Sequence, residues 1–271
     1  MKIGFVGLGN MATAIIGGLL REGTTLSSED DNATVITAAN IIGSAKTEAT
    51  RQKRAEQFGI AVTASNREVA EAADVLVLAV KPQFFPEVIA EIRDAVSENT
   101  LVISIAAGLT LERIAGLFDR DVTAMRLIRC MPNTPALVNA GCTAVAPGPG
   151  ATEADEALCL RLMESFGRAI VIPERLMDAA SAVAGSSPAF VFMFIEALAD
   201  GAAQAYEFAA AAVAGSTQLV LETGRHPGDL KDMVCSPGGT TIEGVKALEE
   251  GAFRASVMNA IVACVEKAKA L

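Results

Sequence analysis

The chain reads Ile3-Gly4-Phe5-Val6-Gly7-Leu8-Gly9-Asn10-Met11-Ala12 near its start, and this stretch decides the fold. An apolar run of strand length leads into a glycine turn, and a helical pattern follows. Gly7 permits the tight turn, Gly9 lets the backbone approach a pyrophosphate, and the small Ala12 lets the helix pack against the strand. The helix N-terminus adds amide donors and a partial positive charge. The stretch therefore predicts dinucleotide binding, with a glycine-rich turn that binds nothing as the alternative.

Strand and helix patterns alternate through the first part of the chain. The expected strands are residues 3–8, 35–42, 73–80, 101–105 and 122–128, and the expected helices between them are residues 10–22, 48–58, 82–96 and 111–118. Short strands at 143–146 and 170–172 extend the sheet around a helix at 153–166. This alternation is typical of βαβ units and a parallel sheet.

Strand signals stop after Pro173, and only helical patterns follow. They cover residues 177–183, 189–208, 209–223, 227–234, 241–250 and 253–268, and the alanine-rich stretch 202–214 predicts close helix packing. The fold class is therefore α/β, with a Rossmann dinucleotide-binding domain at residues 1–173 and an all-helical domain at residues 174–271.

Composition narrows the classes of function. With 51% hydrophobic residues, the 271-residue chain can bury a full core. A net charge of −10 argues against a nucleic-acid partner, and a single histidine argues against a histidine-based metal site. The five cysteines are widely spaced without a Cys-x-x-Cys pair, which favours buried free thiols in a reducing compartment. The uncharged run 3–20 contains five glycines, so we expect a cytoplasmic protein and no membrane span.

The residues after the second expected strand favour NADPH over NADH. An NAD enzyme usually places an acid at that strand end, where it binds the ribose hydroxyls. Asp30 lies before the strand rather than after it, and no acid follows directly at either of its candidate ends, residue 38 or 42. Ser44 and Lys46 follow instead, with Arg51 and Lys53 downstream, which suits a 2′-phosphate. An ordinary solvated helix face is the alternative for these cations, and NADH is the alternative cofactor.

Small residues follow two further buried strands. Because ligands of open parallel sheets lie beyond the carboxyl ends of the strands, both segments are candidate cofactor contacts. They comprise Ala79, Val80, Lys81 and Pro82 after one strand, and Ala106, Ala107 and Gly108 after the next. Lys81 is equally well explained as a phosphate ligand or as a surface lysine. The loop Arg129–Pro135 also follows a strand, and Asn133 and Thr134 give it donors near the same crevice, with simple loop stiffening as the alternative.

A second glycine-containing loop, Ser236-Pro237-Gly238-Gly239-Thr240-Thr241, leads into a helix far from the first motif. Exposed amides at a helix start can hold an anion, such as a substrate carboxylate. A plain helix cap by Thr240 or Thr241 is the alternative reading.

Together these segments resemble the pyrroline-5-carboxylate reductase family over nearly the whole chain. The most specific stretch is Val234–Thr241, which follows Leu230-Lys231-Asp232, and the stretch Ile195–Gly201 also fits. The resemblance implies a Rossmann domain and a helical dimerisation domain, with a homodimer that often assembles into rings. It also implies reduction of 1-pyrroline-5-carboxylate to L-proline, the last step of proline biosynthesis, with NADPH or NADH.

The resemblance also assigns roles to individual residues. It places the cofactor at Gly7, Leu8, Gly9, Asn10, Met11, Ala12, Ser44, Asn66, Ala79, Val80, Lys81, Pro82, Ala106, Ala107 and Gly108. It places the substrate carboxylate at Ser236, Gly238, Gly239, Thr240 and Thr241. Lys46 joins the cofactor residues on its charge, and Thr241 is the expected hydrogen-bonding partner at the reacting substrate. No metal is expected.

Two other functions remain as alternatives. A β-hydroxyacid dehydrogenase shares the N-terminal motif and the helical second half, but its chemistry needs a lysine in the interdomain helix. No lysine lies between Gly185 and Tyr206. A dinucleotide-binding regulator without catalysis would have little use for the loop Ser236–Thr241.

Overall fold

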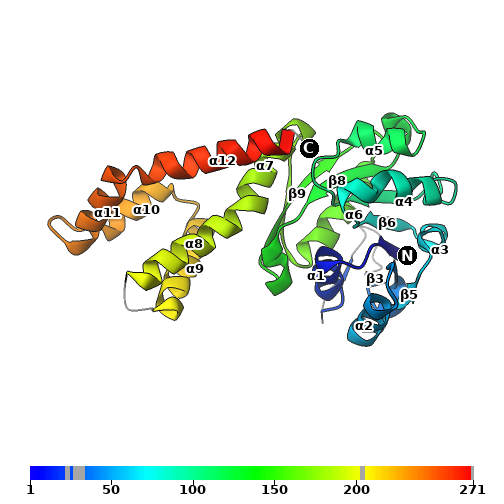
Figure 1. The fold of residues 1–271 in the computed structure, drawn as a ribbon, viewed down its shortest axis with the longest axis horizontal. Coiled ribbons are helices and arrows are strands. Elements are labelled where there is room, and N and C mark those ends of the chain that lie inside the picture. Colours follow the sequence, from blue (N-terminus) through cyan, green and yellow to red (C-terminus); the bar gives the residue numbers. More distant parts are fainter. Residues whose placement is uncertain (22–24, 27–33, 202–204, 270–271) are drawn as a thin grey trace. The chain divides into compact units, whose positions relative to one another are not determined.

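The computed structural model describes residues 1–21, 25–26, 34–201 and 205–269 (Figure 1). The chain forms two compact units, one comprising Met1–Gly185 and the residues from Lys267 on, the other comprising Ser186–Glu266. The two compact units divide between Gly185 and Ser186, inside the helical region. The domain boundary expected after Pro173 lies where the strand signals end, and it stays a prediction.

The first unit is built on an eight-stranded sheet with the order β10-β9-β8-β7-β6-β1-β4-β5. The strands are β1 (Ile3–Val6), β4 (Ile41–Ser44), β5 (Ala61–Thr63), β6 (Val75–Leu78), β7 (Leu101–Ser104), β8 (Leu127–Met131), β9 (Gly141–Pro147) and β10 (Gly167–Val171). A separate hairpin pairs β2 (Thr25–Leu26) with β3 (Thr34–Val35). From β5 to β8 the order is that of a Rossmann sheet, with β1 at the switch point between β4 and β6.

Helices cover both faces of this sheet. They are α1 (Asn10–Leu19), α2 (Glu48–Phe58), α3 (Asn66–Ala72), α4 (Phe85–Ile92), α5 (Leu111–Leu117), α6 (Glu153–Glu164) and α7 (Met177–Ala180). Short 3₁₀ turns lie at Ala38–Asn40, Pro82–Phe84, Val122–Ala124, Thr134–Val138 and Glu174–Leu176, and Ser181–Ser186 is π-helical.

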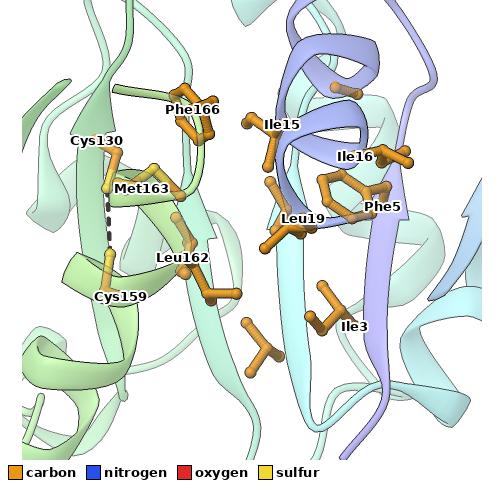
Figure 2. Packing of buried hydrophobic residues seen from close by; sticks show 14 of the residues in the cluster. Ile3, Phe5, Ile15, Ile16, Leu19, Cys130, Cys159, Leu162, Met163 and Phe166 are labelled. Atoms are coloured by element: carbon orange, nitrogen blue, oxygen red, sulfur yellow. Dashed lines mark hydrogen bonds between the residues drawn. The ribbon is translucent and has the colours of Figure 1, made fainter. Parts of the chain in front are cut away.

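Alternating residues of β1 supply two separate cores. Ile3 and Phe5 lie in the cluster formed by residues of α1 and of the end of α6, together with the fully buried Phe166 just after α6 (Figure 2). Val6 points to the opposite face and packs in the cluster that contains residues of α3, α4 and α5. Because β1 is covered on both faces, its residues form the continuous apolar run that identified it in the sequence.

Three sequence expectations about the sheet are wrong in detail. The apolar run 35–42 is not one strand: Thr37 and Asn40 form a capping box around a 3₁₀ turn, and the sheet strand begins only at Ile41. The strand expected at 122–128 likewise begins at Leu127, after a 3₁₀ turn. The sheet is also not wholly parallel, because β8 and β9 pair antiparallel.

The helical unit contains α8 (Ser187–Asp200), α9 (Tyr206–Thr223), α10 (Pro227–Val234), α11 (Thr240–Glu250) and most of α12 (Phe253–Lys269). The expected break at residues 208/209 is wrong, since α9 already includes Tyr206. Part of the alanine-rich stretch 202–214 lies outside the described residues.

Large apolar side chains are exposed on the helical unit. Phe208 is 82% exposed, and Phe192, Met193 and Met258 are more than half exposed. Among the described residues, one helical run, from Glu174 to Asp200, is long and apolar enough to span a bilayer on length and composition alone. Apolar faces of this kind also suit a subunit interface.

Candidate cofactor and substrate sites

A cavity of about 490 Å³ lies in the first unit at the carboxyl ends of β1, β4 and β6. Eight of the residues expected to bind the cofactor line it: Gly7, Gly9, Ser44, Lys46, Asn66, Ala79, Val80 and Lys81. The remaining lining residues are Ala45, Ala64, Phe84, Glu87, Val88 and Glu91. The fold thus brings together segments that are spread over more than seventy positions of the sequence.

The glycine turn has the geometry that close backbone approach requires. Gly7 has φ +97°, and a Cβ there would lie 2.8 Å from Val80 Cγ1 and 3.0 Å from the Ala79 carbonyl oxygen. Gly9 has extended backbone and is the N-cap of α1, yet a Cβ on it would meet nothing within 4 Å. No side chain caps α1, and its first turn holds no acid. The open space at Gly9 and the uncapped helix end fit a dinucleotide pyrophosphate.

Hydrogen bonds join three polar side chains of this cavity in a row. The Ser44 hydroxyl, at the end of β4 and fully buried, donates to Asn66 Oδ1 at 2.7 Å. Asn66, the first residue of α3, donates through Nδ2 to Glu91 Oε2 of α4, also at 2.7 Å. The second Rossmann strand therefore ends on a hydroxyl rather than on an acid.

The expected cations divide into two groups. Lys46 and Lys81 line the cavity and are exposed. Arg51 instead donates to the backbone carbonyl oxygens of Ala45, at 2.7 Å, and Lys46, at 3.1 Å. Lys53 does not line the cavity, so it fits an ordinary solvated helix face. Asp30 lies outside the described residues.

The other expected cofactor residues lie around the cavity rather than on its wall. Leu8, Ala12 and Ala106 are buried in the two cores. The remaining ones are Asn10 and Met11 in the first turn of α1, Pro82 at the start of a 3₁₀ turn, and Ala107 and Gly108 in the turn after β7. Gly108 has φ +74° and lines a different cavity of about 640 Å³, together with Arg129 and Glu174.

The loop after β8 is held by its own side chains. Asn133 accepts a hydrogen bond from the Cys142 amide at 2.8 Å and donates to the Ala184 carbonyl oxygen at 2.9 Å. The buried Arg129 forms ion pairs with Glu174, at 3.3 Å, and Asp178, at 3.8 Å. These contacts fit the loop-stiffening reading of Asn133.

The expected substrate loop is a tight turn in the helical unit. The Gly239 amide donates to the Ser236 carbonyl oxygen at 3.0 Å, and Gly238 has φ +68°. With Pro237 in second place, this is the pattern of a type II turn. Gly239 is the N-cap of α11 and has no side-chain cap, so the capping role considered for Thr240 and Thr241 is wrong. Both threonines lie inside the first helical turn with exposed side chains.

Sequence reasoning missed the residues that α4 adds to the cavity wall. Glu87, Val88 and Glu91 lie at the spacing of one helical face. That spacing was visible in the sequence, but the place of the face became evident only once α4 was packed beside α3. Among the described residues, no cluster of three or more His, Cys, Asp or Glu side chains could hold a metal ion.

Comparison with known proteins agrees with this geometry. Residues 174–271 match a family model described as pyrroline-5-carboxylate reductase dimerisation, and residues 2–108 match one described as NADP oxidoreductase, coenzyme F420-dependent. The pyrroline-5-carboxylate reductase of Escherichia coli is 49% identical, and the alignment covers 100% of this chain and 98% of that protein. The chain belongs to the pyrroline-5-carboxylate reductase family.

Solved structures of this reductase family show the same fold. The pyrroline-5-carboxylate reductase of Coxiella burnetii superposes with a TM-score of 0.86 at 34% identity, covering 99% of this chain and 97% of that one. The Plasmodium falciparum pyrroline carboxylate reductase, solved with NADP bound, gives a TM-score of 0.82 at 29% identity over 100% of this chain and 97% of that one.

Proposed function

We propose that this protein reduces 1-pyrroline-5-carboxylate to L-proline with NADPH, the last step of proline biosynthesis. The observation that carries the proposal is the cavity at the switch point of the Rossmann sheet, whose wall contains Gly7, Gly9, Ser44 and Asn66. Membership of the reductase family and the turn Ser236–Gly239 support it.

The reaction needs little chemistry from the protein's side chains. When bound, the nicotinamide supplies a hydride to the imine carbon, and the ring nitrogen ends as a secondary amine. A cyclic imine can arrive already protonated, so the site needs no dedicated general acid. The protein's task is to orient the substrate and to hold its carboxylate.

Separate groups of residues perform the two binding tasks. The amides at the start of α1 hold the pyrophosphate, and Ser44, Lys46 and Asn66 face the adenosine end. In the helical unit, Ser236 and the uncapped start of α11 hold the carboxylate. Thr241 is a hydrogen-bonding partner of the bound substrate.

A single assay tests this function. Purified protein is mixed with 1-pyrroline-5-carboxylate and NADPH, and the loss of NADPH absorbance is followed together with the appearance of proline. Oxidation that requires the imine and yields proline supports the proposal. Binding of NADPH without turnover would favour the regulator instead.

We further propose a cytoplasmic homodimer built by the helical unit, with rings of dimers as a higher assembly and no metal or membrane involvement. The exposed Phe192, Met193 and Phe208 supply the apolar surface that such an interface covers. Sedimentation at micromolar concentration tests the assembly, and a stable monomer there would contradict it.

A further inference from the structure

The cavity assigned to the cofactor contains a carboxylate in an unexpected place. Glu91 accepts a hydrogen bond from Asn66 Nδ2 at 2.7 Å, and Asn66 in turn accepts one from the Ser44 hydroxyl. An ionised carboxylate only accepts hydrogen bonds, so Glu91 fixes which end of the Asn66 amide faces Ser44. Ser44 must then donate its single proton to Asn66.

This arrangement affects what the cavity offers a ligand. The Ser44 hydroxyl is fully buried and its proton is committed to Asn66, so Ser44 offers no donor to a phosphate. A phosphate at this point must rely on the second Nδ2 proton of Asn66 and on Lys46 and Lys81. The lining of the cavity also contains two acids, Glu87 and Glu91, which offset the charge of the two lysines.

We propose that Glu91 is a specificity-determining residue that lowers the preference for NADPH over NADH, because its carboxylate opposes the 2′-phosphate beside Ser44 and Asn66. The inference rests on the proposed cofactor site. It makes Glu91 a residue that acts on the choice of cofactor by its charge, from a place fixed by its hydrogen bond with Asn66.

The test uses Glu91→Gln, because glutamine has nearly the same shape, keeps one acceptor oxygen for Asn66 Nδ2 and removes the negative charge. Binding of adenosine 2′,5′-bisphosphate and of 5′-AMP to the full-length protein is measured by calorimetry. Removing one like charge near a solvent-open phosphate changes affinity by about three- to tenfold. We expect the bisphosphate to bind tighter by that factor and 5′-AMP to bind as before.

Asp94→Asn is the matched control. Asp94 lies just beyond the end of α4, is exposed and does not line the cavity, so its removal changes the net charge equally. In steady-state assays, Glu91→Gln should lower KM for NADPH with kcat unchanged.

Three results would overturn the inference: an unchanged ratio of the two affinities, weaker binding of the bisphosphate, or an equal gain in Asp94→Asn. The reductase assay of the wild-type protein is read separately. An active wild type with an unchanged ratio would reject the role of Glu91 alone. An inactive wild type with a shifted ratio would reject only the proposed reaction.

Discussion

Replacing Thr241 by alanine separates a substrate contact from a structural role. Thr241 is the second residue of α11, and its exposed hydroxyl has no hydrogen-bond partner among the described residues. Because Gly239 is the N-cap, Thr241→Ala removes no cap. Alanine also has the higher helix propensity, so we expect folding stability to stay constant or to rise by about 0.5 kcal/mol.

The expected kinetic effect is much larger. A hydrogen bond to a charged group contributes roughly 1.5–3 kcal/mol, so losing one from the bound imine should lower kcat/KM about ten- to hundredfold. NADPH binding, followed by fluorescence, should change little, because the cofactor cavity is lined by residues of the other unit.

The assay compares Thr241→Ala with two further variants. Thr241→Ser keeps the hydroxyl and should retain most of the activity. Thr217→Ala makes the same chemical change in α9, where the hydroxyl donates only to the Val213 carbonyl oxygen at 2.9 Å, and should leave kcat/KM unchanged. A Thr241→Ala enzyme with normal kcat/KM, or one that loses activity only in step with a lower melting temperature, would refute the substrate contact.

Three further changes have expected outcomes of their own. Gly9→Ala should fold normally, because its Cβ meets nothing within 4 Å, yet bind both cofactors weakly; Gly7→Ala should instead lower the melting temperature, because φ is +97° there. Lys46→Ala should weaken NADPH by about three- to tenfold in titrations and leave NADH nearly unchanged; equal losses would place the 2′-phosphate elsewhere. Burial alone would raise the pKa of Asp155, but hydrogen bonds from Arg126 and Thr152 outweigh it and hold this pKa below its usual value. The stability that the ionised Asp155 contributes is thus present at neutral pH and is lost as the pH falls through the lowered pKa. Asp155→Asn should therefore lower the free energy of unfolding by about 1.5–3 kcal/mol in denaturant titrations at pH 7. A loss of stability that persists in strong acid would contradict this.

The fold could be predicted largely because burial leaves a direct trace in the sequence. The run Ile3–Val6 is apolar throughout because both faces of β1 are covered. The run 35–42 is mostly apolar but has a different structure, since the side chains of its two polar residues, Thr37 and Asn40, bond to nearby backbone and close a 3₁₀ turn. Strand direction leaves no such trace, so the antiparallel β9 could not be foreseen.

Some residues of the candidate site could likewise be predicted from the sequence, and others could not. Gly7, Gly9 and Ser44 could be named because each lies next to a recognisable strand end. Glu91 could not, because its contact with Asn66 joins residues on two helices and exists only after α3 and α4 have packed together. Arg51 shows the converse: its charge suited a phosphate, but it donates instead to the backbone carbonyl oxygens of Ala45 and Lys46, just before its own helix.

The contact between Cys130 and Cys159 allows local opening of the first unit to be measured by the reaction of its own thiols. Only these two of the five cysteines are buried; their sulfur atoms lie 3.4 Å apart, between β8 and α6 (Figure 2). The hydrogen bond with Cys159, together with burial, raises the pKa of Cys130 well above its usual value, so its unreactive thiol form persists at neutral pH. Thiol reagents should therefore modify the half-buried Cys142, Cys235 and Cys264 first. The slower rate at which Cys130 and Cys159 then react would measure how often α6 separates from the sheet, without any introduced label.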